Sequence, residues 1–184
     1  LSRAQAEVQG DPGRLDVNPW AVNVGNGILD LRTGQIDPHR PDAWLTKLAP
    51  VDYRPDAGAP RWERFMEEVF PDRATRTYVH RALGYCLTGE VREQAWWFAY
   101  GEGANGKSVL LDTVSSVLGD YACAVNPDTF RAHNHAQPNQ YQLAGLRGVR
   151  LIQAPEMDED TPIAEGMLKA VTGNRTVAAR VPYG

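Results

Sequence analysis

The chain has 184 residues and a net charge of −4, enough for one ordinary domain or for a small domain joined to part of a larger one. Hydrophobic residues make up 42% and charged residues 23%, which is typical of a folded globular protein and excludes a disordered chain. No apolar run reaches the roughly 20 residues of a membrane helix, and Cys86 and Cys123 are too few for a disulfide framework. We therefore expect a protein of the reducing cytoplasm, and the leucine at position 1 suggests an excised fragment.

The N-terminal region predicts a β-hairpin. Residues 20–24 and 28–31 are apolar stretches on either side of Asn26-Gly27, a dipeptide that tolerates the positive φ angles of a tight turn. Thr33-Gly34 predicts a second turn shortly afterwards. This part of the chain is therefore expected to form short strands around turns.

Two helices are predicted after a looping connector over residues 38–60. The first has apolar residues at i, i+3, i+4, i+7 and i+8, which places them on one face, and Pro71 ends it; these residues are Trp62, Phe65, Met66, Val69 and Phe70. The second helix runs from an N-cap at Asp72 to Leu87 and is stopped by Gly89. Its inner side is expected to hold Tyr78, Ala82, Tyr85 and Cys86.

The second half of the chain reads as the start of an alternating α/β unit. Residues 95–100 are a continuous apolar run, as expected for a strand buried on both faces of a parallel sheet. A glycine-rich loop and a helix closed by Gly119 follow, and residues 149–154 predict a second buried strand. A helix is predicted over residues 162–171, and the start of a strand or hairpin over residues 176–183.

The segment from Gly101 to Ser108 matches the pattern G-x-x-x-x-G-K-[ST] between a predicted strand and a predicted helix. Glycines let successive backbone amides point inward and form a nest for anions. The Lys107 ammonium would counter charge on the β- and γ-phosphates, and the Ser108 hydroxyl would hold Mg²⁺. We therefore predict a site for ATP and Mg²⁺ whose contacts come from Gly101, Gly103, Ala104, Asn105, Gly106, Lys107, Ser108 and Val109.

Such a loop requires a carboxylate at the end of a neighbouring strand, where it holds Mg²⁺ through water and polarises the attacking water. Glu156 lies nearest the end of the strand predicted over residues 149–154, and it is the predicted catalytic acid and second metal ligand. Asp158 and Glu159 are alternatives in the same acidic stretch.

These motifs resemble superfamily 3 helicases of phage, plasmid and poxvirus primase–helicases. The resemblance rests on the loop Gly101–Ser108, on Leu146–Leu151 leading to Glu156, and on Met167–Gly173 followed by Ala179-Arg180. Upstream, residues 26–34, 37–39 and 83–89 are similar to the small domain that precedes the ATPase in that family. One departure is that Pro155 precedes Glu156, where many family members carry paired acids.

The resemblance implies an α/β fold with a P-loop NTPase (AAA-like) core. In this chain that core would be truncated, occupying residues 91–184 after a small mixed domain of residues 1–90 with a β-hairpin region and helices. It also implies a ring, a hexamer in the full-length protein, that moves 3′-to-5′ along single-stranded DNA, with a primase domain in the same polypeptide or complex. Its sensor and arginine finger would lie beyond Gly184, so the fragment is expected to be a poor hydrolase.

The predicted function is that of an ATP-dependent DNA helicase or translocase module of a phage or plasmid primase–helicase. By resemblance, Lys169, Arg175 and Arg180 are the candidate DNA contacts, and the acidic net charge requires such contacts to be local. Two alternatives stay open. One is another P-loop NTPase, such as a small-molecule kinase, and the other is a replication initiator that binds a nucleotide without unwinding DNA.

Overall fold

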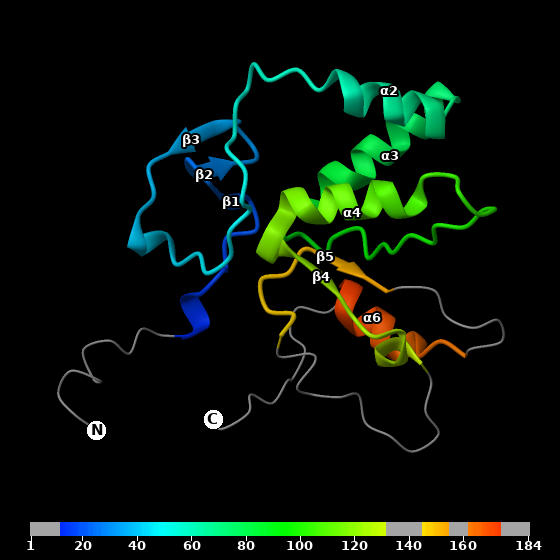
Figure 1. The fold of residues 1–184 in the computed structure, drawn as a ribbon. Coiled ribbons are helices and arrows are strands. Elements are labelled where there is room, and N and C mark those ends of the chain that lie inside the picture. Colours follow the sequence, from blue (N-terminus) through cyan, green and yellow to red (C-terminus); the bar gives the residue numbers. More distant parts are fainter. Residues whose placement is uncertain (1–11, 132–144, 155–161, 174–184) are drawn as a thin grey trace.

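The computed structural model describes residues 12–131, 145–154 and 162–173 (Figure 1). Its α-helices are α2 (Pro60–Val69), α3 (Arg73–Cys86), α4 (Lys107–Leu118) and α6 (Glu165–Gly173). Its strands are β1 (Ala21–Val24), β2 (Gly27–Asp30), β3 (Gln35–Asp37), β4 (Ala122–Ala124) and β5 (Leu151–Gln153). Short 3₁₀ helices are η1 (Pro12–Arg14), η2 (Pro41–Ala43), η3 (Gly119–Tyr121) and η4 (Pro127–Phe130). Each helix in these ranges is too short or too polar to cross a bilayer.

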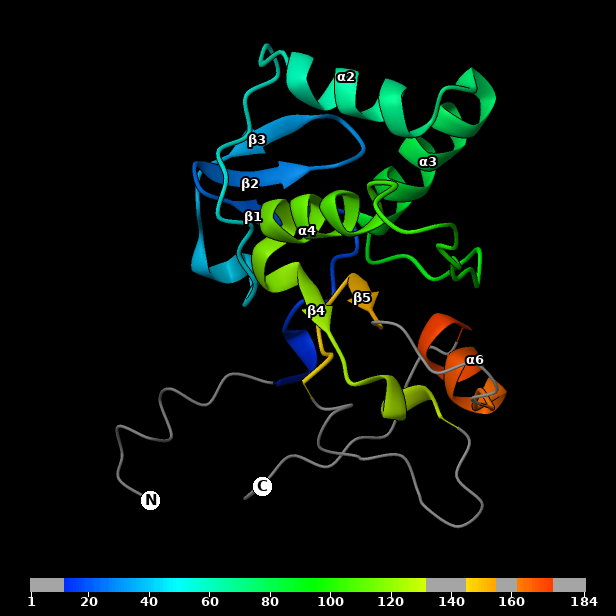
Figure 2. The ribbon, with the colours of Figure 1, turned by 45° about the vertical axis from the view of Figure 1, so that its right-hand side comes forward.

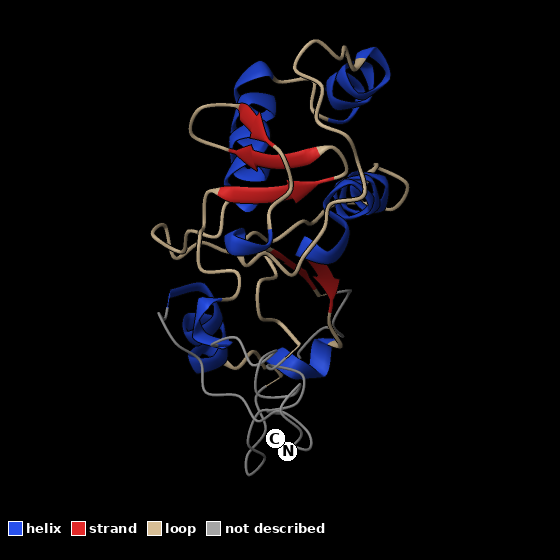
Figure 3. Cartoon of the chain, turned by 90° about the vertical axis from the view of Figure 1, so that its left-hand side faces the viewer, coloured by secondary structure: helices blue, strands red, loops and turns tan. Residues whose placement is uncertain are grey.

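Strands β1, β2 and β3 form an antiparallel meander, which confirms the predicted hairpin (Figure 3). Val24 pairs with Gly27, so the two loop residues are Gly25 and Asn26, one position earlier than the predicted turn. The Asn26 side chain fixes this turn against the connector, because it donates to the Tyr53 carbonyl and accepts from the Tyr53 amide at 2.9 Å each.

The two predicted helices of the small region are present as α2 and α3. The N-cap prediction at Asp72 is confirmed, because its carboxylate accepts from the Thr75 amide at 2.6 Å, and this bond lowers the pKa of Asp72. Met66 of α2 and Cys86 of α3 are buried as predicted. The placement of Tyr78 on the inner side of α3 was wrong, since this side chain is 60% exposed and its hydroxyl accepts from Trp97 Nε1 at 2.9 Å.

Helix α4 begins and ends where the sequence predicts, and it lies between the meander and a second, two-stranded sheet (Figure 2). In that sheet β4 and β5 pair in parallel, with Ala122 opposite Leu151. The strand predicted over residues 149–154 is confirmed in its central part as β5. It is half-buried rather than fully buried, because β4 is its one partner among the described strands.

The prediction of a buried strand over residues 95–100 was wrong. These residues form no strand, and Trp96, Phe98 and Tyr100 are 51%, 67% and 85% exposed. A central parallel strand is held by ladder hydrogen bonds to neighbours. In the described ranges β4 and β5 pair with each other, and no strand is hydrogen-bonded to residues 95–100. An apolar run alone therefore did not determine a strand here.

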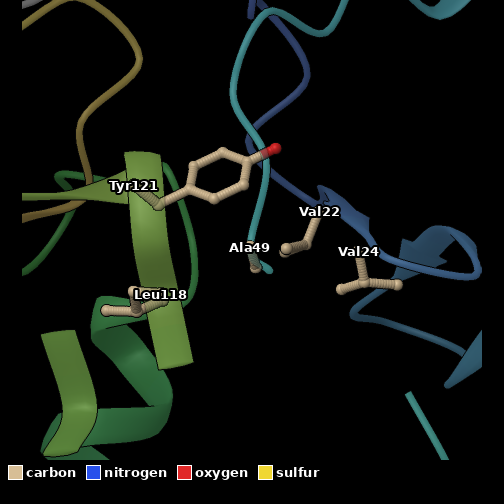
Figure 4. Packing of buried hydrophobic residues seen from close by; sticks show 5 residues of the cluster. All are labelled: Val22, Val24, Ala49, Leu118 and Tyr121. Carbon is tan, nitrogen blue, oxygen red and sulfur yellow. The ribbon is translucent and has the colours of Figure 1, made fainter. Parts of the chain in front are cut away.

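One hydrophobic core joins the meander to the end of α4 (Figure 4). Val22, Val24 and Ala49 pack with Leu118 and Tyr121, and all five are at most 4% exposed. The Tyr121 hydroxyl accepts from the Asn23 amide at 2.9 Å. Buried side chains thus connect the stretches before and after residue 90, while the division into two domains at that point stays a prediction.

Helix α6 confirms the helix predicted over residues 162–171, although it starts at Glu165 and ends at Gly173. Met167 packs on Phe130 of η4 in a second buried cluster, with Ile152 of β5 against it. The strand or hairpin predicted over residues 176–183 lies outside the described residues.

Candidate functional site

The glycine-rich loop leads directly into α4, and its backbone takes left-handed conformations. Gly106 is the N-cap of α4 and has φ 87°, and Ala104 also has a positive φ of 58°. A Cβ on Gly106 would lie 2.7 Å from Val69 Cγ2, so the end of α2 packs too closely against the loop for a side chain. Glycine at 106 is therefore required by both the turn and the neighbouring helix.

The N-terminus of α4 has free capacity for an anion. The first amides of an α-helix have no carbonyl one turn earlier to accept their hydrogen bonds. Gly106 has no side chain that could cap them, and the first turn of α4 contains no acidic residue. The loop residues 101–105 are solvent-exposed. An anion at this point would receive hydrogen bonds from these amides and the favourable end of the helix dipole.

Lys107 is the cation of this site, and its side chain folds back over the loop. The ammonium donates to the carbonyls of Gly101 and Glu102 at 2.8 and 3.1 Å, and to Asn105 Oδ1 at 3.0 Å. Ser108 follows it in the first turn of α4 and is exposed. The structure thus brings together the predicted contact residues from Gly101 to Val109 in one exposed loop and helix start.

Gln153 is a residue of this region that the sequence analysis missed. Its amide donates to the Leu111 carbonyl at 3.0 Å and to Ser115 Oγ, so the carboxyl end of β5 is attached to α4. A polar side chain in an apolar strand is the signal that could have found it, because a half-buried amide needs partners. Glu156, Asp158 and Glu159 follow β5 in the sequence, but they lie outside the described residues.

Of the candidate DNA contacts, Lys169 lies among the described residues. This side chain lies on α6, is 79% exposed, and forms an i,i+4 ion pair with Glu165 at 3.3 Å. Arg175 and Arg180 lie outside the described residues. Within the described ranges, no three His, Cys, Asp or Glu side chains gather to hold a metal ion. Of the two predicted Mg²⁺ ligands, Ser108 is the one that lies among the described residues.

Comparison with known proteins finds similarity to one sequence family and to viral proteins that carry the names of helicases and primases. Residues 1–71 match the family described as D5 N terminal like. A protein of Acanthamoeba polyphaga mimivirus with the name "Putative helicase" is 28% identical over 189 residues, which covers 97% of this chain and 19% of the relative. A protein of Frog virus 3 (isolate Goorha), also named a helicase, is 32% identical over 65% of this chain and 12% of the relative.

A third relative carries the name "Putative primase". It comes from African swine fever virus (isolate Warthog/Namibia/Wart80/1980) and is 27% identical over 90% of this chain and 18% of its own length. The chain therefore spans a fifth or less of the length of these relatives. Together, the family match and these names show that the chain is similar to D5-type viral proteins that are named helicases or primases.

Proposed function

We propose that the chain is part of an ATP-driven DNA translocase, the superfamily 3 helicase module of a replication primase–helicase. The observation that carries the proposal is the exposed loop from Gly101 to Gly106, which turns into the uncapped start of α4 with the Lys107 ammonium folded over it. The names of the relatives support the replication context.

In this proposal the start of α4 receives the phosphates of ATP. Backbone amides of the loop and of the first helical turn donate to phosphate oxygens, and Lys107 moves its ammonium from the loop carbonyls to the β- and γ-phosphates. Bound Mg²⁺ would neutralise charge that develops on the phosphates. Ser108 Oγ would hold the ion, and Glu156 would orient the attacking water.

The DNA partner is proposed from the resemblance and from exposed charge. Lys169 extends into solvent from α6, and its ion pair with Glu165 is too exposed to hold it strongly. Lys169, Arg175 and Arg180 would then contact the backbone of single-stranded DNA in the channel of a ring. The proposed ring is a hexamer, and a primase domain would belong to the same polypeptide or complex.

The test is the Lys107→Ala variant of the intact protein, assayed for ATP hydrolysis with and without single-stranded DNA. We expect the DNA-stimulated rate to fall by about 10²–10³, the usual effect of removing one electrostatic contact to a transition state. Lys47→Ala is the matched control, because Lys47 lies in the connector before the loop, and it should keep the wild-type rate.

A wild-type rate in Lys107→Ala would contradict the proposal. Hydrolysis that needs a nucleoside or metabolite acceptor and ignores DNA would instead favour the kinase alternative. Strand displacement from a forked DNA substrate then separates a translocase from a DNA-stimulated ATPase that does not unwind.

A further inference from the structure

The Lys107 ammonium is fully satisfied by its own loop. An ammonium group has three N–H donors, and the loop supplies an acceptor for each one, at 2.8, 3.1 and 3.0 Å. Two acceptors are backbone carbonyls, which any residue would offer. The third is the side-chain oxygen of Asn105, so the residue at position 105 decides how firmly the cation is held.

The Asn105 side chain lies across the loop. Its amide nitrogen faces Gly101, where an added Cβ would lie 2.5 Å from Asn105 Nδ2. Its amide oxygen meets Lys107 on the other side. Asn105 is exposed and belongs to no buried cluster, so it is not needed to fill the core.

We propose that Asn105 is a positioning residue that holds the Lys107 ammonium on the loop until a phosphate replaces it. This inference rests on the proposed function, because it takes the incoming ligand to be a nucleoside triphosphate. Binding then exchanges the Asn105–Lys107 bond for a Lys107–phosphate bond, and Asn105 sets part of the cost of that exchange.

The direction in which substitutions of Asn105 change the affinity for ATP distinguishes this role from a direct contact with nucleotide. Without the Asn105 oxygen, one charge-assisted bond no longer has to be broken, so Asn105→Ala should bind ATP more tightly, by up to about tenfold. Asn105→Asp keeps an acceptor and adds a negative charge, so it should hold Lys107 more firmly and bind ATP more weakly. A residue that contacts phosphate or maintains the loop would give weaker binding in Asn105→Ala.

The first experiment needs no nucleotide. Each lysine of the intact protein is labelled with trace acetic anhydride, and the modified peptides are quantified by mass spectrometry. Two further lysines of the chain, Lys47 and Lys169, serve as internal references for Lys107. We expect Asn105→Ala to increase the labelling of Lys107 severalfold, and Asn105→Asp to leave it at or below the wild-type level.

The second experiment measures the affinity of the same variants for a non-hydrolysable ATP analogue with Mg²⁺. Increased Lys107 labelling together with tighter binding in Asn105→Ala supports the proposal. Unchanged labelling in Asn105→Ala, equal labelling in the Ala and Asp variants, or weaker binding in Asn105→Ala would each overturn it. If neither wild type nor variant binds the analogue, the proposed function fails, while the labelling result still reports whether Asn105 holds Lys107.

Discussion

Cys86 shows how burial sets the chemistry of a single side chain. It is the last residue of α3 and is 7% exposed. Burial raises the pKa of the Cys86 thiol from 9.0 to about 11, because the charged thiolate loses its hydration in the protein. The thiol is therefore protonated at neutral pH, and thiol reagents should reach it only when the fold opens.

Alkaline pH should destabilise the fold through Cys86. The folded pKa lies above the unfolded value, so the stabilisation is complete below about pH 9 and is lost as pH rises towards 11. A shift of two units corresponds to about 2–3 kcal/mol. Urea unfolding between pH 8 and 11 should show a steeper loss of stability in wild type and in Cys123→Ala than in Cys86→Ala, in which buried Tyr121, whose pKa is also raised, still contributes a loss. An equally steep loss in Cys86→Ala would contradict the prediction.

At the scale of elements, the end of α4 shows why helix boundaries were more predictable than strands. Gly119 ends the helix with φ 54°, and an added Cβ would lie 2.7 Å from the Leu48 carbonyl oxygen and closer still to Pro50 Cδ. A glycine after an apolar helical stretch carries this stop signal in the sequence itself. Its second role is to let the connector pass close to the helix. That role depends on Leu48 and Pro50, which are distant in the sequence, so local sequence could not predict it.

Gly119→Ala should therefore lower the free energy of unfolding by about 2–4 kcal/mol, because the strained positive φ and the steric overlap act together. Gly84→Ala is the matched control. Gly84 lies inside α3 with open space around it, so alanine there should stabilise the fold by about 0.5–1 kcal/mol. Thermal unfolding of both variants checks the pair, and equal effects of the same sign would refute the packing argument.

The strands show where local sequence was insufficient. Helices α2, α3, α4 and α6 were predicted because their periodicity, caps and stops are local signals. Strand β4 was missed, because Ala122-Cys-Ala124 has no strand-like residues and is a strand through its pairing with β5. Residues 95–100 were wrongly assigned for the converse reason: they are strand-like in composition but are paired with no described strand.

In the site, the loop pattern predicted which residues gather, but not that Asn105 holds Lys107 or that Gln153 attaches β5 to α4.

At the scale of the whole molecule, Arg150 connects parts of the chain that lie far apart in sequence. Its guanidinium donates to the carbonyls of Leu87 and Ala21 at 2.5 and 2.6 Å and lies 4.7 Å from the ring centre of Tyr121. Burial lowers the pKa of the guanidinium, which the nearby Tyr121 and Asp16 partly oppose. One side chain thus joins α3, the meander and the start of β5.

Arg150→Ala should lower the free energy of unfolding by about 2–4 kcal/mol, because it leaves half-buried carbonyls without a donor. Arg64→Ala is the control. Arg64 is 82% exposed in an i,i+4 pair with Glu68, so its loss should cost no more than about 0.5 kcal/mol. Hydrogen exchange should show loss of protection in both the meander and β5 of Arg150→Ala. Protection lost in only one of them would show that Arg150 does not join them.

The packing of Tyr121 and Leu118 against Val22, Val24 and Ala49 also constrains how such proteins evolve. The family match ends at residue 71. The hydrophobic core that contains Val22, Val24 and Ala49 is nevertheless completed by Leu118 and Tyr121, which follow the glycine-rich loop in the sequence. Recombination between relatives that exchanged only the first segment would bring together surfaces that had diverged separately. The hairpin and the helix end should therefore be inherited together, and chimeras between relatives should fold best when positions 118 and 121 come from the same parent as the hairpin.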